Sequence, residues 1–316
     1  MKLVRWSNVL FLAVLLWIME KWVATPILVN AYFREEMPWY ILLLLILATT
    51  MIAAGGYVIN DYFDVKIDRI NRPDELIVTR SISKPTAMRL SWILSGIGIV
   101  CGIAVAVLLR SFTLGIIFVI VPGLLWFYSS SYKRLFMIGN LTIALLAALA
   151  PMIIATANVA ILNQKYEVIM PYTTLGNDIY LWLGGFAVFA FLLTWIREIV
   201  KDLQDQMGDR ELECHTMPVV WGEKWTKVFV TVLIVGTLAL IGHLWYHVLP
   251  FDTGWQSAST RYIALGIVIP LLSCIWLLWS AKIPSEYKTC QQTIKFTMLI
   301  GMLYSFIIWR YLGMVG

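Results

Sequence analysis

Two short segments of this chain repeat one spacing of carboxylates. The first acidic motif, residues 60–69, is NDYFDVKIDR, and the second acidic motif, residues 201–210, is KDLQDQMGDR. Both contain Asp-x-x-Asp-x-x-x-Asp-Arg, and in a helix residues at i, i+3 and i+7 share one face. Each motif would therefore present its carboxylates together: Asp61, Asp64 and Asp68 in the first, and Asp202, Asp205 and Asp209 in the second.

Carboxylates grouped in this way repel one another. Each motif also follows an apolar segment and would end a helix, where the macrodipole disfavours a negative charge by about 0.3 to 1 kcal/mol. A positive charge must offset this cost, and Mg²⁺ prefers hard oxygen ligands of this kind. The duplication predicts two sides of one divalent-cation site.

Basic residues accompany both motifs and the end of the fourth apolar segment. Acids that hold a metal, next to bases that hold an anion, indicate a diphosphate site. Ordinary ion pairs between loops are the alternative, but ionisable groups within membrane proteins are usually functional. The basic residues concerned are Lys66, Arg69, Arg72, Lys133, Arg134, Arg197 and Lys201.

Composition predicts an all-α integral membrane protein. Apolar residues make up 60% of the chain and charged residues 14%, against roughly 45–50% and 25% in soluble domains. About nine segments reach the length of a spanning helix, so we expect one membrane domain over residues 1–316. The segments are residues 8–29, 38–59, 90–109, 112–127, 138–161, 181–200, 228–248, 262–279 and 296–312.

The distribution of basic residues predicts the orientation. With a cytoplasmic amino terminus, eighteen of the 24 lysines and arginines fall on the inner face, as the positive-inside rule requires. Both acidic motifs then lie on the cytoplasmic side of a multi-pass protein, in the inner membrane of a bacterial or archaeal cell. No basic run of the kind that binds nucleic acid is present.

The two acidic motifs resemble those of a known family. Residues 60–73, NDYFDVKIDRINRP, are similar to the first aspartate-rich motif of the UbiA superfamily of intramembrane prenyltransferases, and the second acidic motif is similar to the second. Arg5 and Asn8 match an Arg-x-x-Asn signature, and Tyr128 with Lys133 and Arg134 matches a Tyr-and-basic motif. The resemblance covers nearly the whole chain.

The resemblance implies that Mg²⁺ ions hold the diphosphate of an isoprenyl donor. Asn60, Asp64 and Asp68 are expected at one ion and Asp205 and Asp209 at the other, with Asp61 and Asp202 as supporting or alternate ligands. Tyr128 is expected beside the allylic cation, and the four ligand aspartates with Tyr128 form the expected catalytic group. The diphosphate is expected at Asn8, Arg69, Arg72, Lys133, Arg134 and Lys201. Arg80 stands where the family usually has glycine.

The expected reaction transfers a prenyl group to a lipophilic acceptor among the membrane lipids. The second motif is most similar to the branch that alkylates a prenylated glycerol phosphate, which favours geranylgeranyl diphosphate as donor and geranylgeranylglyceryl phosphate as acceptor. Aromatic quinone precursors, such as 4-hydroxybenzoate or dihydroxynaphthoate, are the alternative acceptors. A cation transporter is an alternative of another class, although transport sites tend to lie near the bilayer midplane.

Overall fold

The computed structural model describes residues 3–33, 37–71, 77–249, 254 and 257–315. Among these residues every regular element is helical, apart from an isolated bridge between Val78 and Ile82. Nine helical segments of the described chain are long and apolar enough to cross a membrane. The prediction of an all-helical bundle with about nine spans is confirmed.

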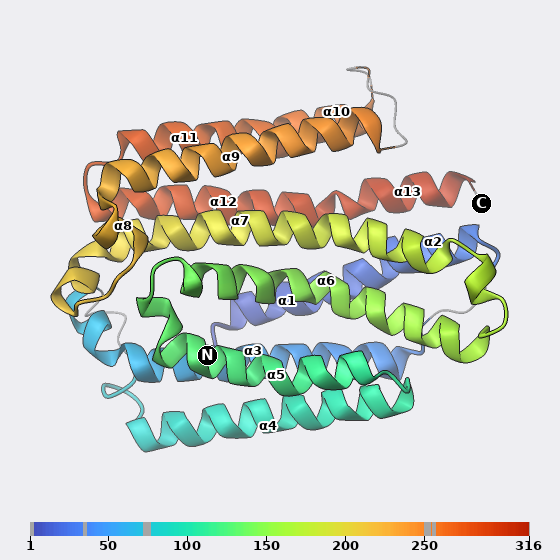
Figure 1. The fold of residues 1–316 in the computed structure, drawn as a ribbon, viewed down its shortest axis with the longest axis horizontal. Helices are drawn as coiled ribbons and strands as arrows, with labels where there is room; N and C mark the ends of the chain where they lie inside the picture. The colour runs from blue at the N-terminus through green and yellow to red at the C-terminus, as the bar shows by residue number, and fades with distance from the viewer. Residues whose placement is uncertain (1–2, 34–36, 72–76, 250–253, 255–256, 316) are drawn as a thin grey trace. The chain divides into compact units, whose positions relative to one another are not determined.

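Figure 1 shows the helices, coloured in chain order. Their bounds are α1 (Trp6–Ile18), α2 (Thr25–Asn30), α3 (Trp39–Asn71), α4 (Lys84–Leu108), α5 (Phe112–Ser130), α6 (Ile138–Lys165), α7 (Leu175–Glu211), α8 (Met217–Val220), α9 (Gly222–His247), α10 (Ala258–Ile263), α11 (Ile269–Ser280), α12 (Tyr287–Leu303) and α13 (Ser305–Val315).

Several helices extend beyond the apolar segments that predicted them. The ninth span begins at Pro284, where the sequence suggested residue 296, and α7 begins at Leu175, where it suggested residue 181. Charged and polar residues at these ends remain helical because they can reach water while the backbone stays hydrogen-bonded. Both α3 and α7 also continue through the acidic motifs, as their spacing predicted.

The chain forms two compact units. The first comprises Met1–Tyr132, Ala148–Ala187 and Ile308–Gly316, and the second comprises Lys133–Ala147 and Val188–Ile307. The first acidic motif belongs to the first unit and the second acidic motif to the second unit. Helices α6 and α7 each begin in one unit and end in the other.

In the first unit α3, α4 and α5 pack side by side, and α1 packs on α3 (Figure 1). A close backbone approach joins α3 to α4, where a methyl group on Gly98 would lie 2.8 Å from the Ala48 carbonyl oxygen. Ser91 donates its hydroxyl to the Gly55 carbonyl at 2.9 Å. Small residues thus permit close helix packing where water is absent.

The first span of the chain contains a π-helical turn, Met19–Ala24, between α1 and α2. Its Glu20 is fully buried and accepts hydrogen bonds from the Asn158 amide at 2.6 Å and the Thr25 hydroxyl at 3.2 Å. Turns of this type interrupt α-helices at particular sites. Here the turn carries the buried carboxylate that joins this span to α6.

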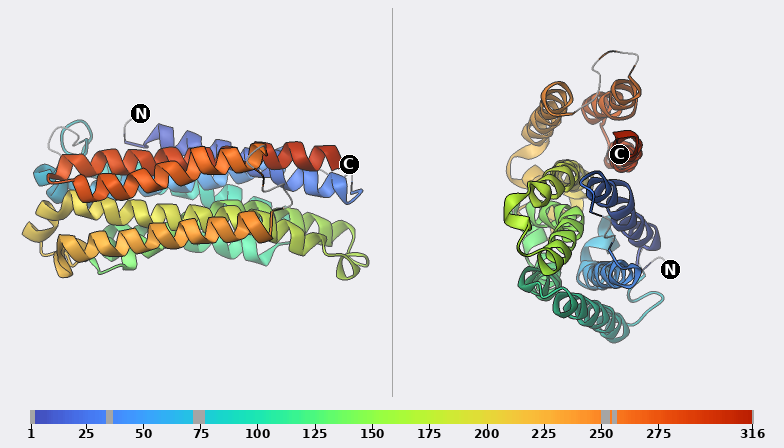
Figure 2. Two further views of the ribbon diagram at one scale, coloured as in Figure 1. Left: turned by 90° about the horizontal axis from the view of Figure 1, so that it is seen from above. Right: turned by 90° about the vertical axis from the view of Figure 1, so that its right-hand side faces the viewer.

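In the second unit α11 packs against α9 and α12 (Figures 1 and 2). Buried Lys227 on α9 donates to the Ala281 carbonyl at 2.9 Å and pairs with Glu223 at 2.8 Å. Tyr287 donates its hydroxyl to the same Glu223 at 2.7 Å. This network fixes the connection between α11 and α12 to the start of α9.

Large apolar side chains cover much of the surface. On α4, Trp92, Val100 and Val107 are 63%, 68% and 70% exposed. Such residues are satisfied by lipid tails, and helices can cross lipid because their backbone groups are bonded internally. The exterior therefore suits a bilayer.

Candidate active site

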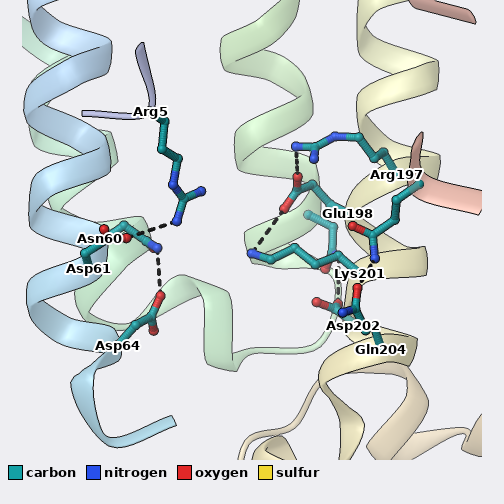
Figure 3. Close-up of polar contacts among 11 residues, drawn as sticks. Arg5, Asn60, Asp61, Asp64, Arg197, Glu198, Lys201, Asp202 and Gln204 are labelled. Carbon is teal, nitrogen blue, oxygen red and sulfur yellow. Dashed lines mark hydrogen bonds and ion pairs between the residues drawn. The ribbon is translucent and has the colours of Figure 1, made fainter. Parts of the chain in front are cut away.

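The first acidic motif occupies the last turns of α3. The Asn60 amide donates to Asp64 Oδ2 at 2.7 Å, four residues away (Figure 3). Asn60 is buried, whereas Asp64 and Asp68 are half-buried. The amide and carboxylate oxygens of this helix face are the hard ligands that Mg²⁺ prefers.

A cation from another element reaches this motif. Arg5, just before α1, lies with its Nη2 3.0 Å from Asp61 Oδ1 (Figure 3). Its guanidinium carbon lies 5.2 Å from the centre of the Tyr57 ring. Burial would lower the pKa of Arg5, but Asp61, with smaller contributions from Tyr57 and Asp64, raises it above its ordinary value. Arg5 is therefore a permanent charge that offsets part of the carboxylate repulsion expected from the sequence.

The second acidic motif is held by side chains that come from outside α7. The Asn140 amide of α6 donates to Asp202 Oδ2 at 2.7 Å. The Thr216 hydroxyl donates to Asp209 Oδ2 at 2.9 Å, and the Cys214 amide donates to the Asp209 carbonyl at 2.8 Å. The chain thus folds back on the end of α7 and fixes the last aspartate.

The same fold-back joins the second motif to the basic pair after α5. The His215 amide donates to the Arg134 carbonyl at 2.8 Å. Lys133 is half-buried and Arg134 is exposed at this point. Two groups of predicted site residues, distant in sequence, therefore meet at one end of the second unit.

One turn before Asp202, α7 carries an ion-pair cluster around a buried glutamate. Glu198 Oε1 pairs with Arg197, and Glu198 Oε2 lies 4.0 Å from Lys201 Nζ (Figure 3). The Glu198 side chain is only 7% exposed. On the next turn Gln204 accepts a hydrogen bond from the Gln291 amide of α12 at 2.6 Å.

The structure brings together only part of the predicted site. Asn60, Asp61 and Asp64 meet in the first unit. In the second unit the fold-back after α7 links Asp209 to Arg134, and Asn140 holds Asp202 separately. Of the other predicted residues, Asp68 and Arg69 lie on α3, Tyr128 on α5, Asn8 on α1, and Lys201 and Asp205 on α7. Arg72 lies outside the described residues.

No three His, Cys, Asp or Glu side chains within the described residues gather into a group that could hold a metal ion. The acidic motifs belong to separate units, so their sharing of one metal site stays a prediction.

Sequence reasoning missed Asn140, Thr216 and Glu198 as site residues. Glu198 does carry a signal, since a charged residue within an apolar spanning segment is usually functional. Asn140 carries none, because its partner is 62 positions away. Thr216 gives no periodic signal because it lies in the fold-back after α7.

A polytopic helical protein with two aspartate-rich helix ends has the features of an intramembrane prenyltransferase. The model of the UbiA prenyltransferase family matches residues 22–302. The chain belongs to this family, and it is a prenyltransferase and a multi-pass integral membrane protein.

Two relatives of this chain carry the same name. Digeranylgeranylglyceryl phosphate synthase of Methanosphaera stadtmanae is 29% identical over 259 residues, covering 81% of this chain and 82% of its own. The synthase of the same name from Saccharolobus solfataricus is 33% identical over 213 residues, covering 64% and 67%. Within the family, the chain is therefore similar to synthases of this name.

Solved structures agree with the fold. A structure from work on digeranylgeranylglyceryl phosphate synthase in membranes aligns with a TM-score of 0.61 and 26% identity, over 98% of this chain and 96% of its own. A UbiA homolog from Archaeoglobus fulgidus, bound to DMAPP and Mg²⁺, aligns with a TM-score of 0.57 and 16% identity, over 98% of both chains. The second alignment shows the fold alone.

Proposed function

We propose that this chain transfers a geranylgeranyl group from geranylgeranyl diphosphate to the free hydroxyl of geranylgeranylglyceryl phosphate, in a Mg²⁺-dependent reaction. The observation that carries the proposal is the pair of acidic motifs, in a chain similar to digeranylgeranylglyceryl phosphate synthases over four fifths of both lengths. The products would be the ether lipid and diphosphate.

The residues of each motif fit Mg²⁺ by their donor chemistry. Asn60, Asp64 and Asp68 would hold one ion, and Asp205 and Asp209 the other. We assign supporting roles to Asp61, which pairs with Arg5, and Asp202, which accepts from Asn140. When bound, the metal would neutralise the negative charge that develops on the leaving diphosphate.

Cationic side chains would share the task of holding the diphosphate. Their charge favours the leaving group most as its bond to carbon breaks. We assign this role to Asn8, Arg69, Arg72, Lys133, Arg134 and Lys201. Tyr128 would place its ring face near the allylic carbon, because ring faces attract cations.

The location follows from the same proposal. The donor and acceptor are both lipids, so a membrane enzyme reaches them without extracting them into water. We place the active-site face on the cytoplasmic side of a bacterial or archaeal inner membrane, because most basic residues fall there, and treat residues 1–316 as one catalytic domain. Nucleic acid has no part in this function.

Product analysis tests the proposal. Purified protein would be incubated with Mg²⁺, geranylgeranyl diphosphate and, in separate reactions, geranylgeranylglyceryl phosphate, 4-hydroxybenzoate or dihydroxynaphthoate, and products identified by mass spectrometry. We expect the digeranylgeranyl ether from the glycerol phosphate. Product from an aromatic acid alone would assign the protein to quinone-precursor prenylation instead, and no product with any acceptor would contradict the proposal.

A further inference from the structure

Polar residues on α7 continue from the second acidic motif into the membrane-spanning part of the helix. Thr194, Trp195 and Glu198 lie within eight residues before Asp202. At about 100° of rotation per residue, these three side chains and Asp202 lie within roughly a third of the helix circumference. We call Thr194, Trp195 and Glu198 the α7 polar stripe.

Two atoms of the α7 polar stripe are buried without a hydrogen-bond partner. Among the described residues, Thr194 Oγ1 and Trp195 Nε1 are the buried side-chain polar atoms in this state. Thr194 is 4% exposed. The stripe therefore contains an acceptor and a donor, on consecutive residues, that the protein itself does not use.

Other residues of the same unit show how these atoms are usually satisfied. Thr226, Thr231 and Thr237 of α9 each donate the hydroxyl to the carbonyl four residues earlier, at 2.8 Å. Trp245 and Trp279 donate their Nε1 hydrogens to threonine hydroxyls at 3.1 Å. Thr194 and Trp195 depart from both patterns although they lie in a regular helix.

The two unsatisfied polar atoms lie in apolar surroundings, which makes their burial unfavourable. Trp195 packs against a core cluster that includes fully buried Leu193, Ile196 and Ile199. An unsatisfied polar group in such surroundings is unfavourable, and native structures retain few of them. Their retention indicates that a polar atom from outside the protein reaches the stripe.

Glu198 supplies the third group of the stripe. Its carboxylate pairs with Arg197 and Lys201, and it lies four residues after Thr194, on the same face of α7. Of the two buried atoms without a partner, Trp195 Nε1 offers a donor and Thr194 Oγ1 offers a donor or an acceptor. This combination matches a hydroxyl group, which donates one hydrogen bond and accepts others.

We propose that the α7 polar stripe binds the hydroxyl of the prenyl acceptor. Trp195 Nε1 would donate a hydrogen bond to the acceptor's hydroxyl oxygen, and Thr194 Oγ1 would accept a hydrogen bond from the same hydroxyl. The inference rests on the proposed function and deepens it by assigning residues to the acceptor. A glycerol hydroxyl and a phenolic hydroxyl share this chemistry.

Two conservative variants test the stripe. Thr194→Val keeps the shape of the side chain, and Trp195→Phe keeps an aromatic ring against Phe191 and Phe229. Kinetics would be measured with geranylgeranyl diphosphate and either geranylgeranylglyceryl phosphate or 4-hydroxybenzoate. We expect KM for the acceptor that the enzyme uses to rise about tenfold in each variant, as for loss of one buried hydrogen bond. KM for the donor should stay unchanged.

The melting temperature of Thr194→Val distinguishes acceptor binding from a purely structural role, because a structural role would lower it. Because Thr194→Val removes an unsatisfied buried hydroxyl, the unliganded variant should melt at or above the wild-type temperature. Acceptor alone should raise the melting temperature of the wild type more than that of the variant. Thr237→Val is the matched control, since that hydroxyl is already bonded, and it should leave both acceptor measurements unchanged.

Each outcome is decisive for the stripe. If the wild type turns over while both variants keep the wild-type acceptor KM, an ordered water alone occupies the stripe and the inference is wrong, although prenyl transfer stands. If no acceptor stabilises the wild type, the stripe binds no acceptor hydroxyl. If acceptors stabilise the wild type and not the variants but no product forms, the stripe stands and the proposed reaction fails.

Discussion

An arginine from another element stabilises the carboxylates of the first acidic motif. Arg5 lies 56 residues from Asp61 in sequence, yet their side chains pair at 3.0 Å. The need for such a cation could be deduced from the carboxylate spacing of the first motif. Its identity could not, because many basic residues of the chain meet the same electrostatic requirement.

The Arg5–Asp61 pair should show measurable coupling. In a cycle of Arg5→Gln, Asp61→Asn and the double variant, we expect a coupling energy of about 0.2 to 1 kcal/mol, because the Arg5 side chain is partly exposed to solvent. Denaturant unfolding in detergent would measure it. Fully additive single effects would show that the contact contributes nothing to stability.

At the scale of helices, sequence periodicity predicted where the helices run but not which side chains contact one another. The apolar segments and the carboxylate spacing correctly predicted that α3 and α7 continue through the motifs. They could not predict the π-helical turn at Glu20, because its buried carboxylate is hydrogen-bonded by Asn158, 138 positions away. They also could not predict which polar side chains from other elements hold Asp202 and Asp209, since such contacts depend on tertiary packing.

The α3–α4 contact gives a prediction at this scale. Gly98→Ala should destabilise the protein by about 1 to 3 kcal/mol, because the added methyl meets the Ala48 backbone and overpacks the interface. Gly96→Ala, two residues away, is the control, since nothing lies within 4 Å of its added methyl. Thermal unfolding of the detergent-solubilised variants would compare them. Equal stability of the two variants would show that α3 and α4 can move apart at no cost.

For the whole molecule, composition and motif resemblance together predicted the class of protein. Nine spans and the family match agree with that expectation. The meeting of the two acidic motifs at one site remains a prediction, because each lies in its own unit. The membrane orientation rests on the distribution of basic residues.

Labelling of single cysteines tests this orientation. In a background without the native cysteines, Ser81→Cys and Tyr172→Cys would each place a thiol at an exposed position. A membrane-impermeant maleimide should label position 81 in inverted vesicles and position 172 in right-side-out vesicles, because the positive-inside rule puts residue 81 in the cytoplasm. The reverse pattern, or labelling of both positions from one side, would contradict the orientation.

The central claim is that the aspartates of each acidic motif hold Mg²⁺ and take part in binding the diphosphate of the donor. Calorimetric titration with geranylgeranyl diphosphate, with and without Mg²⁺, tests it most directly in the wild type, Asp64→Asn, Asp205→Asn and the control Asp178→Asn. Asp178 accepts a hydrogen bond from Thr174 at the opposite end of α7.

We expect binding to require Mg²⁺ and to weaken about ten- to hundredfold in Asp64→Asn and in Asp205→Asn, since each loses a charged contact. Asp178→Asn should bind the donor as the wild type does. Donor binding that is independent of Mg²⁺, or that survives the loss of either motif aspartate, would contradict the roles proposed for the two motifs.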